Sequence, residues 1–233
     1  MVSRTMIDIA VVDYGMGNLR SVSKALEHVA RGLKVMVTSA PDDVRDARRV
    51  VFPGQGAMPD CMRELDARGL RPAVLEAARS KPFLGICIGL QMLFDVSEEG
   101  DVQGLGLLPG RVVRFPASGP TGPGGGKLKV PHMGWNEVQQ AVEHPLWRGI
   151  PQASRFYFVH SYYPVPQDRS SIAAYACYPS PFTCAVARDN LFAVQFHPEK
   201  SQELGLKLLS NFVAWDGVPA APKHAIEEPL AGD

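Results

Sequence analysis

Residues 83–89 read FLGICIG and carry the clearest indication of the fold in this sequence. Its first four residues are apolar on both faces, which is typical of a central strand in a parallel sheet. Cys87 follows with a glycine two positions away on each side, and a helix is predicted over residues 88–95. This pattern is typical of a nucleophile elbow, a sharp turn that exposes a reactive side chain above a sheet. The stretch therefore predicts an α/β sheet with a thiol at the end of a buried strand.

Alternating elements precede this stretch. Short β-branched runs predict strands over residues 7–12, 34–38 and 50–52, and helical patterns cover residues 19–30, 59–68 and 72–80. Turn signals follow the second and third strands, at residues 40–42 and 53–56. Strands that alternate with helices imply a mostly parallel central sheet with helices on both faces.

After residue 100 the pattern changes to short strands between turns rich in Pro and Gly. These strands are predicted over residues 111–115, 156–160, 172–177, 184–187 and 191–196, as antiparallel additions to the same sheet. A last helix is predicted over residues 202–214. Residues 119–126 hold five glycines and two prolines, which predicts a surface loop, since no phosphate-binding Gly-Lys-Ser/Thr follows. One domain over residues 1–215 and a flexible tail over 216–233 are expected.

Composition argues against several classes of protein. Lys plus Arg equal Asp plus Glu at 24 each, and no basic stripe is evident, so no nucleic-acid partner is expected. The apolar run over residues 82–94 is too short for a membrane span. The four cysteines form no C-x-x-C pair, and His28, His144 and His224 are expected at the surface, so neither a metal site nor another cofactor is predicted. With no signal peptide evident, cytoplasmic location is expected.

Cys87 is the candidate nucleophile. The N–H groups of the helix that follows would lower the pKa of its thiol, and the thiolate is the form that attacks carbon. Free cysteines are most often buried and inert, so the flanking residues alone leave a structural role equally open.

His197 and Glu199 supply a base and its orienter near the other end of the chain. Residues i and i+2 of an extended backbone face the same way, and Pro198 favours that extension. In the triad that this predicts, His197 withdraws the proton of Cys87 and Glu199 stabilises the imidazolium. Taken alone, the pair is more typical of a surface ion pair.

The loop over residues 53–56 reads PGQG and follows a strand expected beside that of Cys87. Its glycines would let the N–H of Gln55 turn inward and join the N–H of Ile88 in an oxyanion hole. A simple strand-ending turn is an equally good interpretation of this loop taken alone.

These three motifs, in this chain order, resemble those of class I glutamine amidotransferases, whose triad runs Cys, His, Glu. Three further segments, residues 13–19, 131–136 and 157–162, are similar to the glutaminase subunits of imidazole glycerol phosphate synthases. The resemblance covers about residues 7–215. It implies a flavodoxin-like fold and hydrolysis of glutamine to glutamate through a cysteinyl thioester. It also implies a heterodimer with a (β/α)₈-barrel cyclase subunit, which takes up the ammonia through a tunnel in histidine biosynthesis and is expected to be needed for activity.

The resemblance also implies roles for individual residues. Those that would bind glutamine are Gly54, Gln91, Glu99, His160 and Ser161, with Gln91 and Glu99 at its α-amino end. Those that would contact the cyclase and couple its ligand state to the oxyanion loop are Asn18, His132 and Trp135. By residue type alone, Asn18 could simply cap a helix and Trp135 could be a core aromatic. Gln55 departs from the valine that the family often has there.

Three other functions stay open. A γ-glutamyl hydrolase or cysteine peptidase would use the same fold and triad without an ammonia acceptor. A catalytically silent interaction subunit would leave the triad unused. An amidotransferase subunit of anthranilate or guanylate synthesis would share the triad, and the segment over residues 131–136 argues against it.

Overall fold

The computed structural model describes residues 6–116 and 129–218, and its centre is a nine-stranded sheet. The strands lie in the order β2 (Val35–Thr38), β1 (Ile9–Val12), β3 (Arg49–Gly54), β4 (Phe83–Cys87), β13 (Leu191–Val194), β12 (Pro181–Arg188), β11 (Ile172–Cys177), β8 (His132–Gln140), β9 (Ser154–His160). The first five strands are parallel and the remaining four join antiparallel. The predicted α/β sheet with antiparallel additions is confirmed.

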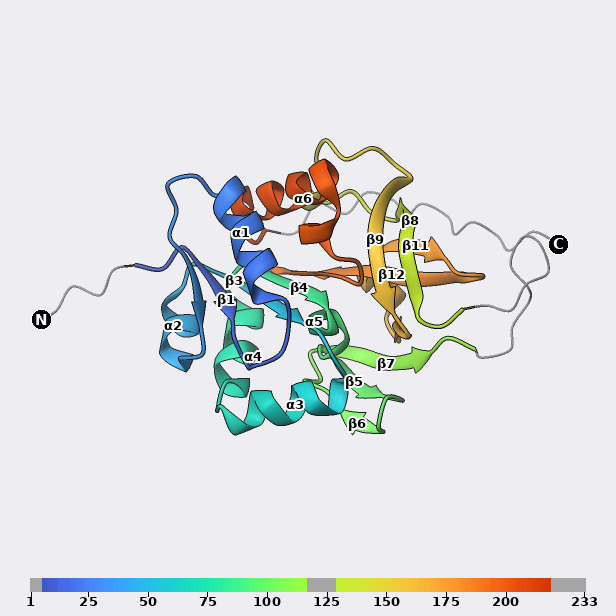
Figure 1. Cartoon of the computed structure of the whole chain (residues 1–233), viewed down its shortest axis with the longest axis horizontal. Coiled ribbons are helices and arrows are strands. Elements are labelled where there is room, and N and C mark those ends of the chain that lie inside the picture. The colour runs from blue at the N-terminus through green and yellow to red at the C-terminus, as the bar shows by residue number, and fades with distance from the viewer. Residues whose placement is uncertain (1–5, 117–128, 219–233) are drawn as a thin grey trace, which may run out of the picture.

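Helices cover both faces of the parallel half (Figure 1). On one face lie α1 (Leu19–Val29) and α6 (Gln202–Ala214), and on the other lie α2 (Pro41–Asp46), α3 (Met58–Ala67) and α4 (Arg71–Ser80). Every residue of β1, β4 and β13 is buried between these layers. The side chain of Asn18 caps α1 by accepting a hydrogen bond from the Ser21 N–H at 3.4 Å.

Two expectations about the middle of the chain are wrong. The helix predicted over residues 88–95 is a single turn, α5 (Ile88–Gln91), because the backbone from residue 94 pairs in a second sheet. That four-stranded sheet contains β10 (Tyr162–Pro166), β7 (Leu108–Arg114), β5 (Phe94–Ser97) and β6 (Val102–Gln103). The strand predicted over residues 111–115 therefore belongs to this second sheet and not to the central one.

Other segments differ from the prediction or lie outside it. Residues 40–42, predicted as a turn, lead into α2, which begins with Pro41 in its first turn. The sequence pattern predicts no strand where β8 and β10 form. The glycine-rich segment over residues 119–126 lies outside the described residues, as does the chain after residue 218.

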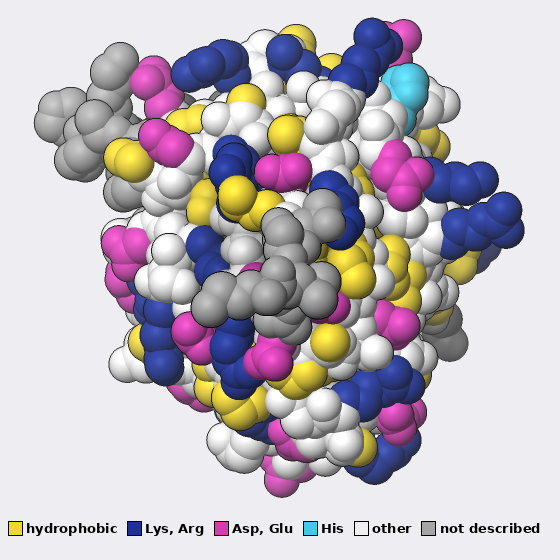
Figure 2. Space-filling view, turned by 90° about the vertical axis from the view of Figure 1, so that its left-hand side faces the viewer, with side chains coloured by type: hydrophobic (Ala, Val, Ile, Leu, Met, Phe, Trp, Pro, Cys, Tyr) yellow, Lys and Arg dark blue, Asp and Glu magenta, His cyan; other side chains and the backbone are white. Residues whose placement is uncertain are grey.

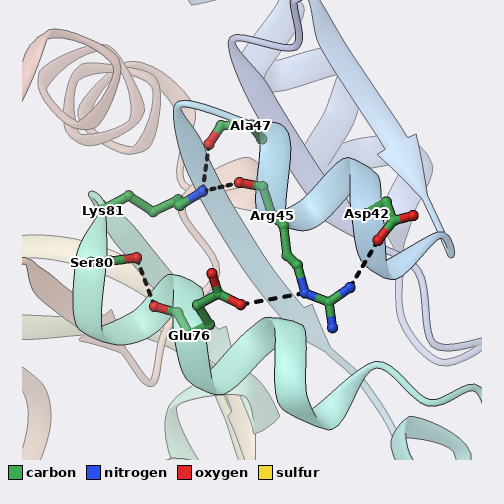
Figure 3. Close-up of polar contacts among 6 residues, drawn as sticks. All are labelled: Asp42, Arg45, Ala47, Glu76, Ser80 and Lys81. Carbon is green, nitrogen blue, oxygen red and sulfur yellow. Dashed lines mark hydrogen bonds and ion pairs between the residues drawn. The ribbon is translucent and has the colours of Figure 1, made fainter.

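Polar contacts hold α2 against α4 beside the sheet (Figure 3). The ammonium of Lys81 donates to the carbonyl oxygens of Arg45 and Ala47 at 2.5 and 2.9 Å, which satisfies carbonyls at the end of α2. Arg45 lies 3.3 Å from Glu76 and 2.9 Å from Asp42. These contacts fix the two helices that flank the N-terminal ends of β3 and β4.

On the face seen in Figure 2, Lys and Arg side chains alternate with Asp and Glu, and no area of a single sign stands out. Over residues 6–116 and 129–218, no helix is long and apolar enough to cross a membrane. The same ranges hold no group of three His, Cys, Asp or Glu side chains that could bind a metal ion.

Strand register brings the functional motifs together. Gly54 at the end of β3 pairs with Cys87 at the end of β4, and Val194 at the end of β13 pairs with Ile86. The segments that follow these three strands therefore leave the sheet at one edge, where ligands bind in open α/β sheets.

Gly89 allows the chain to turn immediately after Cys87. A Cβ atom at this position would overlap the carbonyl oxygen of Phe52 on β3. We expect Gly89→Ala to lower the free energy of unfolding by about 3 kcal/mol or more, because neither backbone segment can move without breaking strand pairing. Urea denaturation of the wild type and the variant measures this difference.

Gly69→Ala is the matched control. It has open space around the new Cβ but a φ of +64°, so a loss of only about 1 kcal/mol is expected. Equal losses in the two variants would contradict the steric argument.

His144 is buried, contrary to the expectation that it lies at the surface. Its ring packs against Phe192 and Trp215, and its Nδ1 accepts a hydrogen bond from the Leu146 N–H at 3.2 Å. Burial lowers the pKa of His144 to about 4. Between about pH 6.5 and 4, His144 therefore binds a proton in the unfolded chain but not in the folded chain.

This burial makes a prediction for acid stability. Between pH 6.5 and 4 the His144 contribution to the free energy of unfolding should fall by about 1.4 kcal/mol per pH unit as pH falls. His144→Asn, which keeps a capping acceptor, should flatten the measured slope by that amount. His28→Asn, at an exposed position on α1, should leave the slope unchanged, and an unchanged slope in His144→Asn would contradict the assignment.

Candidate active site

Cys87 lies at the turn between β4 and α5, as predicted. Its backbone has φ 56° and ψ −111°, a conformation that a residue other than glycine adopts only when its surroundings impose it. The side chain is buried and lines a cavity. The main-chain N–H groups of the short helix α5 begin directly after it, at Ile88. A buried, inert thiol is the poorer interpretation, because this one borders a space that a ligand can enter.

His197 and Glu199 form a buried pair beside Cys87. The Nδ1 of His197 lies 2.8 Å from Oε1 of Glu199, and their side chains are 4% and 1% exposed, so a surface ion pair is excluded. Burial lowers the pKa of His197, but its electrostatic interactions with Cys87 and with the Glu199 carboxylate outweigh it and raise that pKa to about 10. An imidazolium at neutral pH stabilises a neighbouring thiolate.

The backbone around His197 is held from two sides. Its N–H donates to the Tyr157 carbonyl at 2.9 Å, and its carbonyl accepts from the Ser201 hydroxyl at 2.6 Å. The same hydroxyl accepts from the Tyr157 N–H at 3.0 Å. Ser201 therefore ties the His197 backbone to β9, a contact that nothing in the sequence pattern indicated.

A cavity of about 230 Å³ joins most of the predicted site. Its lining includes Gln55, Cys87, Ile88, Gln91, Glu99, His160, Ser161 and His197. Gly54 is outside the lining but pairs with Cys87, and Glu199 lies behind the ring of His197. The lining residues without a sequence prediction are Pro131, Val159, Tyr162 and Gly56.

Gln91 presents an acceptor toward this region. Its Nε2 donates to the Tyr162 carbonyl at 3.0 Å and to the Gln195 side chain at 3.1 Å, while its Oε1 is buried without a hydrogen-bond partner among the described residues. Glu99 uses Oε2 to accept from the Met58 N–H at 2.8 Å. A buried acceptor and a carboxylate in one cavity suit an ammonium group.

The loop over residues 53–56 is held by two buried side chains that had no predicted role. The hydroxyl of Tyr14 donates to the Pro53 carbonyl at 2.9 Å, and the thiol of Cys61 contacts the Gln55 carbonyl at 3.8 Å. Burial raises the pKa of Cys61 to about 11, which removes it as a competing nucleophile. Tyr14 lies in the segment over residues 13–19 that carries the family resemblance, and Cys61 had no such signal.

The three residues expected at a partner interface differ in exposure. Asn18 caps α1, as its residue type allows. Trp135 is 38% exposed and packs edge-on against Tyr157, so it is not a core aromatic. His132 is buried, with its Nδ1 2.9 Å from Nε2 of His160.

The buried carboxylate of Glu199 should control the reactivity of Cys87. Glu199→Gln removes one interaction that raises the pKa of His197, so the imidazolium loses its proton at lower pH and the thiolate loses its partner. We expect alkylation of Cys87 by iodoacetamide at pH 7 to slow by ~10-fold and its midpoint to move to higher pH. Mass spectrometry of the Cys87 peptide measures the rate.

Glu203→Gln is the control, since Glu203 is exposed in the first turn of α6. It should leave the rate of Cys87 alkylation unchanged. A wild-type alkylation profile in Glu199→Gln would show that Glu199 does not support the imidazolium.

Comparison with known proteins places this geometry in a family. The family model described as "Glutamine amidotransferase class-I" matches residues 10–215. The imidazole glycerol phosphate synthase subunit HisH of Nitrosospira multiformis is 68% identical over 213 residues, which cover 91% of this chain and 100% of the relative. The HisH subunit of Thiobacillus denitrificans is 66% identical over 210 residues, covering 90% of this chain and 92% of the relative.

Solved structures agree on the fold. The structure of PurLQS from Thermotoga maritima superposes with a TM-score of 0.67 at 19% identity, covering 90% of this chain and 99% of that one. A crystal structure described as a glutamine amidotransferase gives a TM-score of 0.62 at 17% identity, covering 88% and 99%. The chain belongs to the class I glutamine amidotransferase family and, within it, to the HisH subunits of imidazole glycerol phosphate synthase.

Proposed function

We propose that this chain hydrolyses glutamine to glutamate and ammonia, and that it delivers the ammonia to a cyclase subunit for histidine biosynthesis. The observation that carries the proposal is the buried triad of Cys87, His197 and Glu199, with two of its members lining one cavity. The acceptor is a (β/α)₈-barrel subunit that forms a heterodimer with this chain in the cytoplasm. The relatives named above support this assembly, because their names describe a subunit of a synthase.

Acylation begins with the Cys87 thiolate. Its sulfur attacks the side-chain amide carbon of glutamine and forms a C–S bond, while the amide oxygen takes the negative charge. His197 is protonated in the resting site and gives its proton to the leaving nitrogen, so that ammonia departs as the carbonyl re-forms. Glu199 keeps the imidazole oriented and stabilises its charged form.

The oxyanion requires donors that are in place before the charge develops. The N–H of Ile88 opens α5 next to the sulfur, and the loop that carries Gln55 lines the same cavity. Main-chain donors aimed at the developing charge are the usual source of stabilisation in acyl transfer. We assign the N–H groups of Gln55 and Ile88 to this role.

The other end of glutamine meets Gln91 and Glu99. Gln91 Oε1 and the Glu99 carboxylate are acceptors for the α-ammonium group, and the segment from His160 to Ser161 and Gly54 complete the binding site. Specificity for glutamine follows because a ligand without the ammonium would leave a buried acceptor unpaired.

Deacylation reverses the proton transfer. His197, neutral after ammonia has left, takes a proton from water, and the oxygen attacks the thioester carbon. The C–S bond breaks, glutamate is released and the thiolate–imidazolium pair is restored. Ammonia in bulk water at neutral pH is mostly protonated and not nucleophilic, so delivery to a bound acceptor keeps it reactive.

The partner would contact the surface near Trp135 and the loop that follows β1. Trp135 and Met133 are exposed on β8, at 38% and 62%. Gly17, next to Asn18, lies against the oxyanion loop, since a Cβ on Gly17 would be 3.7 Å from the Gln55 nitrogen. Contact at Asn18 can therefore shift the position of the oxyanion loop. His132 can couple β8 to the cavity through its hydrogen bond with His160. Such gating avoids hydrolysis without an acceptor.

The proposal is tested by assaying glutamate release with and without the cyclase subunit and its ribonucleotide ligand. We expect the isolated chain to be at least ~10²-fold slower than the complex, because an unaligned oxyanion hole loses about that much rate. Cys87→Ala should abolish turnover in the complex. A γ-glutamyl peptide is the comparison substrate.

Preferential hydrolysis of the γ-glutamyl peptide, with no response to the cyclase subunit, would replace this function with that of a hydrolase. Full glutaminase activity of the isolated chain would contradict the hypothesis that the partner gates this activity.

A further inference from the structure

Gln195 connects the predicted nucleophile with the predicted ammonium site, although no sequence pattern indicated a role for it. It directly follows β13 and is completely buried. Its Nε2 donates to the sulfur of Cys87 at 3.8 Å, and its Oε1 accepts from Gln91 at 3.1 Å. One side chain thus contacts both the reactive atom and a residue of the cavity.

The orientation of each amide is fixed by a main-chain oxygen. The Tyr162 carbonyl can only accept, so the group of Gln91 that faces it at 3.0 Å is the NH₂. The same NH₂ donates its second hydrogen to Gln195, which must therefore present its oxygen. The NH₂ of Gln195 is then left for the sulfur of Cys87, and Oε1 of Gln91 is left without a partner among the described residues.

The same carbonyl fixes two histidines. His160 donates from Nδ1 to the Tyr162 carbonyl at 2.8 Å, so its Nε2 is free to accept from Nδ1 of His132 at 2.9 Å. Asn136 donates to the Cys177 carbonyl at 2.9 Å, which turns its NH₂ also toward Nε2 of His132 at 3.2 Å. The hydrogen bonds to the Tyr162 carbonyl at one end and to the Cys177 carbonyl at the other therefore require the same tautomers, with the proton of each ring on Nδ1.

Burial keeps these rings neutral, as the hydrogen bonds require. It lowers the pKa of His132 to about 4 and that of His160 to about 3. Neutral rings that each donate once and accept once can hold fixed directions across the physiological range of pH.

We propose that Gln195 is a positioning residue with two effects: its amide N–H stabilises the Cys87 thiolate, and its amide oxygen turns Gln91 so that Oε1 of Gln91 receives an ammonium group. The second effect rests on the proposed function, because the ammonium is that of glutamine. Hydrogen bonds to a charged acceptor are stronger than those to a neutral one. Ionisation of the Cys87 sulfur therefore strengthens its hydrogen bond with the Gln195 amide, which also orients Gln91.

Two variants separate these effects. Gln195→Leu removes both the donor to sulfur and the acceptor for Gln91. Gln195→Glu keeps an acceptor for Gln91 but places a carboxylate beside the sulfur, which disfavours the thiolate. A role in packing alone would not produce opposite rankings of the two variants in two assays.

The first readout is the pH profile of Cys87 alkylation by iodoacetamide, followed on its peptide by mass spectrometry. At pH 7 we expect Gln195→Glu to slow alkylation by ~10-fold, with the midpoint about one unit higher, and Gln195→Leu to slow it less. The second readout is glutamine turnover in the complex with the cyclase subunit. There we expect Gln195→Leu to raise KM by ~10-fold and Gln195→Glu to raise it less.

Thr183→Val is the control, a swap of similar size at a buried position on β12. It should leave both readouts unchanged. Wild-type alkylation profiles in both Gln195 variants, or an equal rise of KM in both, would overturn the proposal. If the wild-type complex releases no glutamate, the proposed function fails, and the alkylation profiles still decide whether Gln195 donates to sulfur.

A measurement on the unaltered chain covers the case in which the Gln195 variants do not fold. The side-chain amide resonances of Gln195 should shift with pH together with the onset of Cys87 alkylation, and the shift should be lost in Cys87→Ala. Gln195 amide resonances that do not shift as Cys87 ionises would refute the hydrogen bond to sulfur.

Discussion

The close approach of Gly89 to the main chain of β3 is the constraint on which the rest of the site depends. With no side chain at Gly89, the turn after β4 can fold back against the Phe52 carbonyl, and Cys87 takes a backbone conformation that residues other than glycine rarely hold. Strand pairing on both sides of β4 keeps that conformation in place. The sulfur is thereby fixed between segments that follow three neighbouring strands.

Electrostatics then favours a charged imidazole beside this fixed thiol. Interactions with Cys87 and Glu199 raise the pKa of His197, although burial alone would lower it. The remaining histidines of this region, His132 and His160, are neutral because nothing outweighs the effect of their burial on the pKa. The site thus contains one charged imidazole and a neutral hydrogen-bonded pair, and the difference is made by the neighbours of each ring.

Much of this arrangement could be predicted from the sequence. The alternation of apolar runs and helical patterns indicated the parallel half, and α6 has the predicted bounds because its helical pattern is uninterrupted. The length of helix α5 was overestimated because its apolar pattern continues into β5. The partners of β5, β6 and β7, follow later in the chain. A local sequence pattern does not indicate which distant segments will pair as strands.

The same limit applies to the site. Cys87, His197 and Glu199 carry recognisable chemistry at recognisable spacings, so they could be singled out in the sequence. Gln195 and Ser201 each make two side-chain hydrogen bonds, including bonds to groups that only the fold brings near, and a glutamine or serine beside an apolar run gives no such indication.

The Tyr162 carbonyl has a consequence for how this family can diverge. It directs the side chains of both Gln91 and His160, yet it belongs to the main chain and is present whatever residue occupies the position. The tyrosine ring contributes nothing to these two hydrogen bonds. Substitutions at position 162 can therefore change the side chain that lines the cavity without changing which amide and imidazole groups donate hydrogen bonds and which accept them.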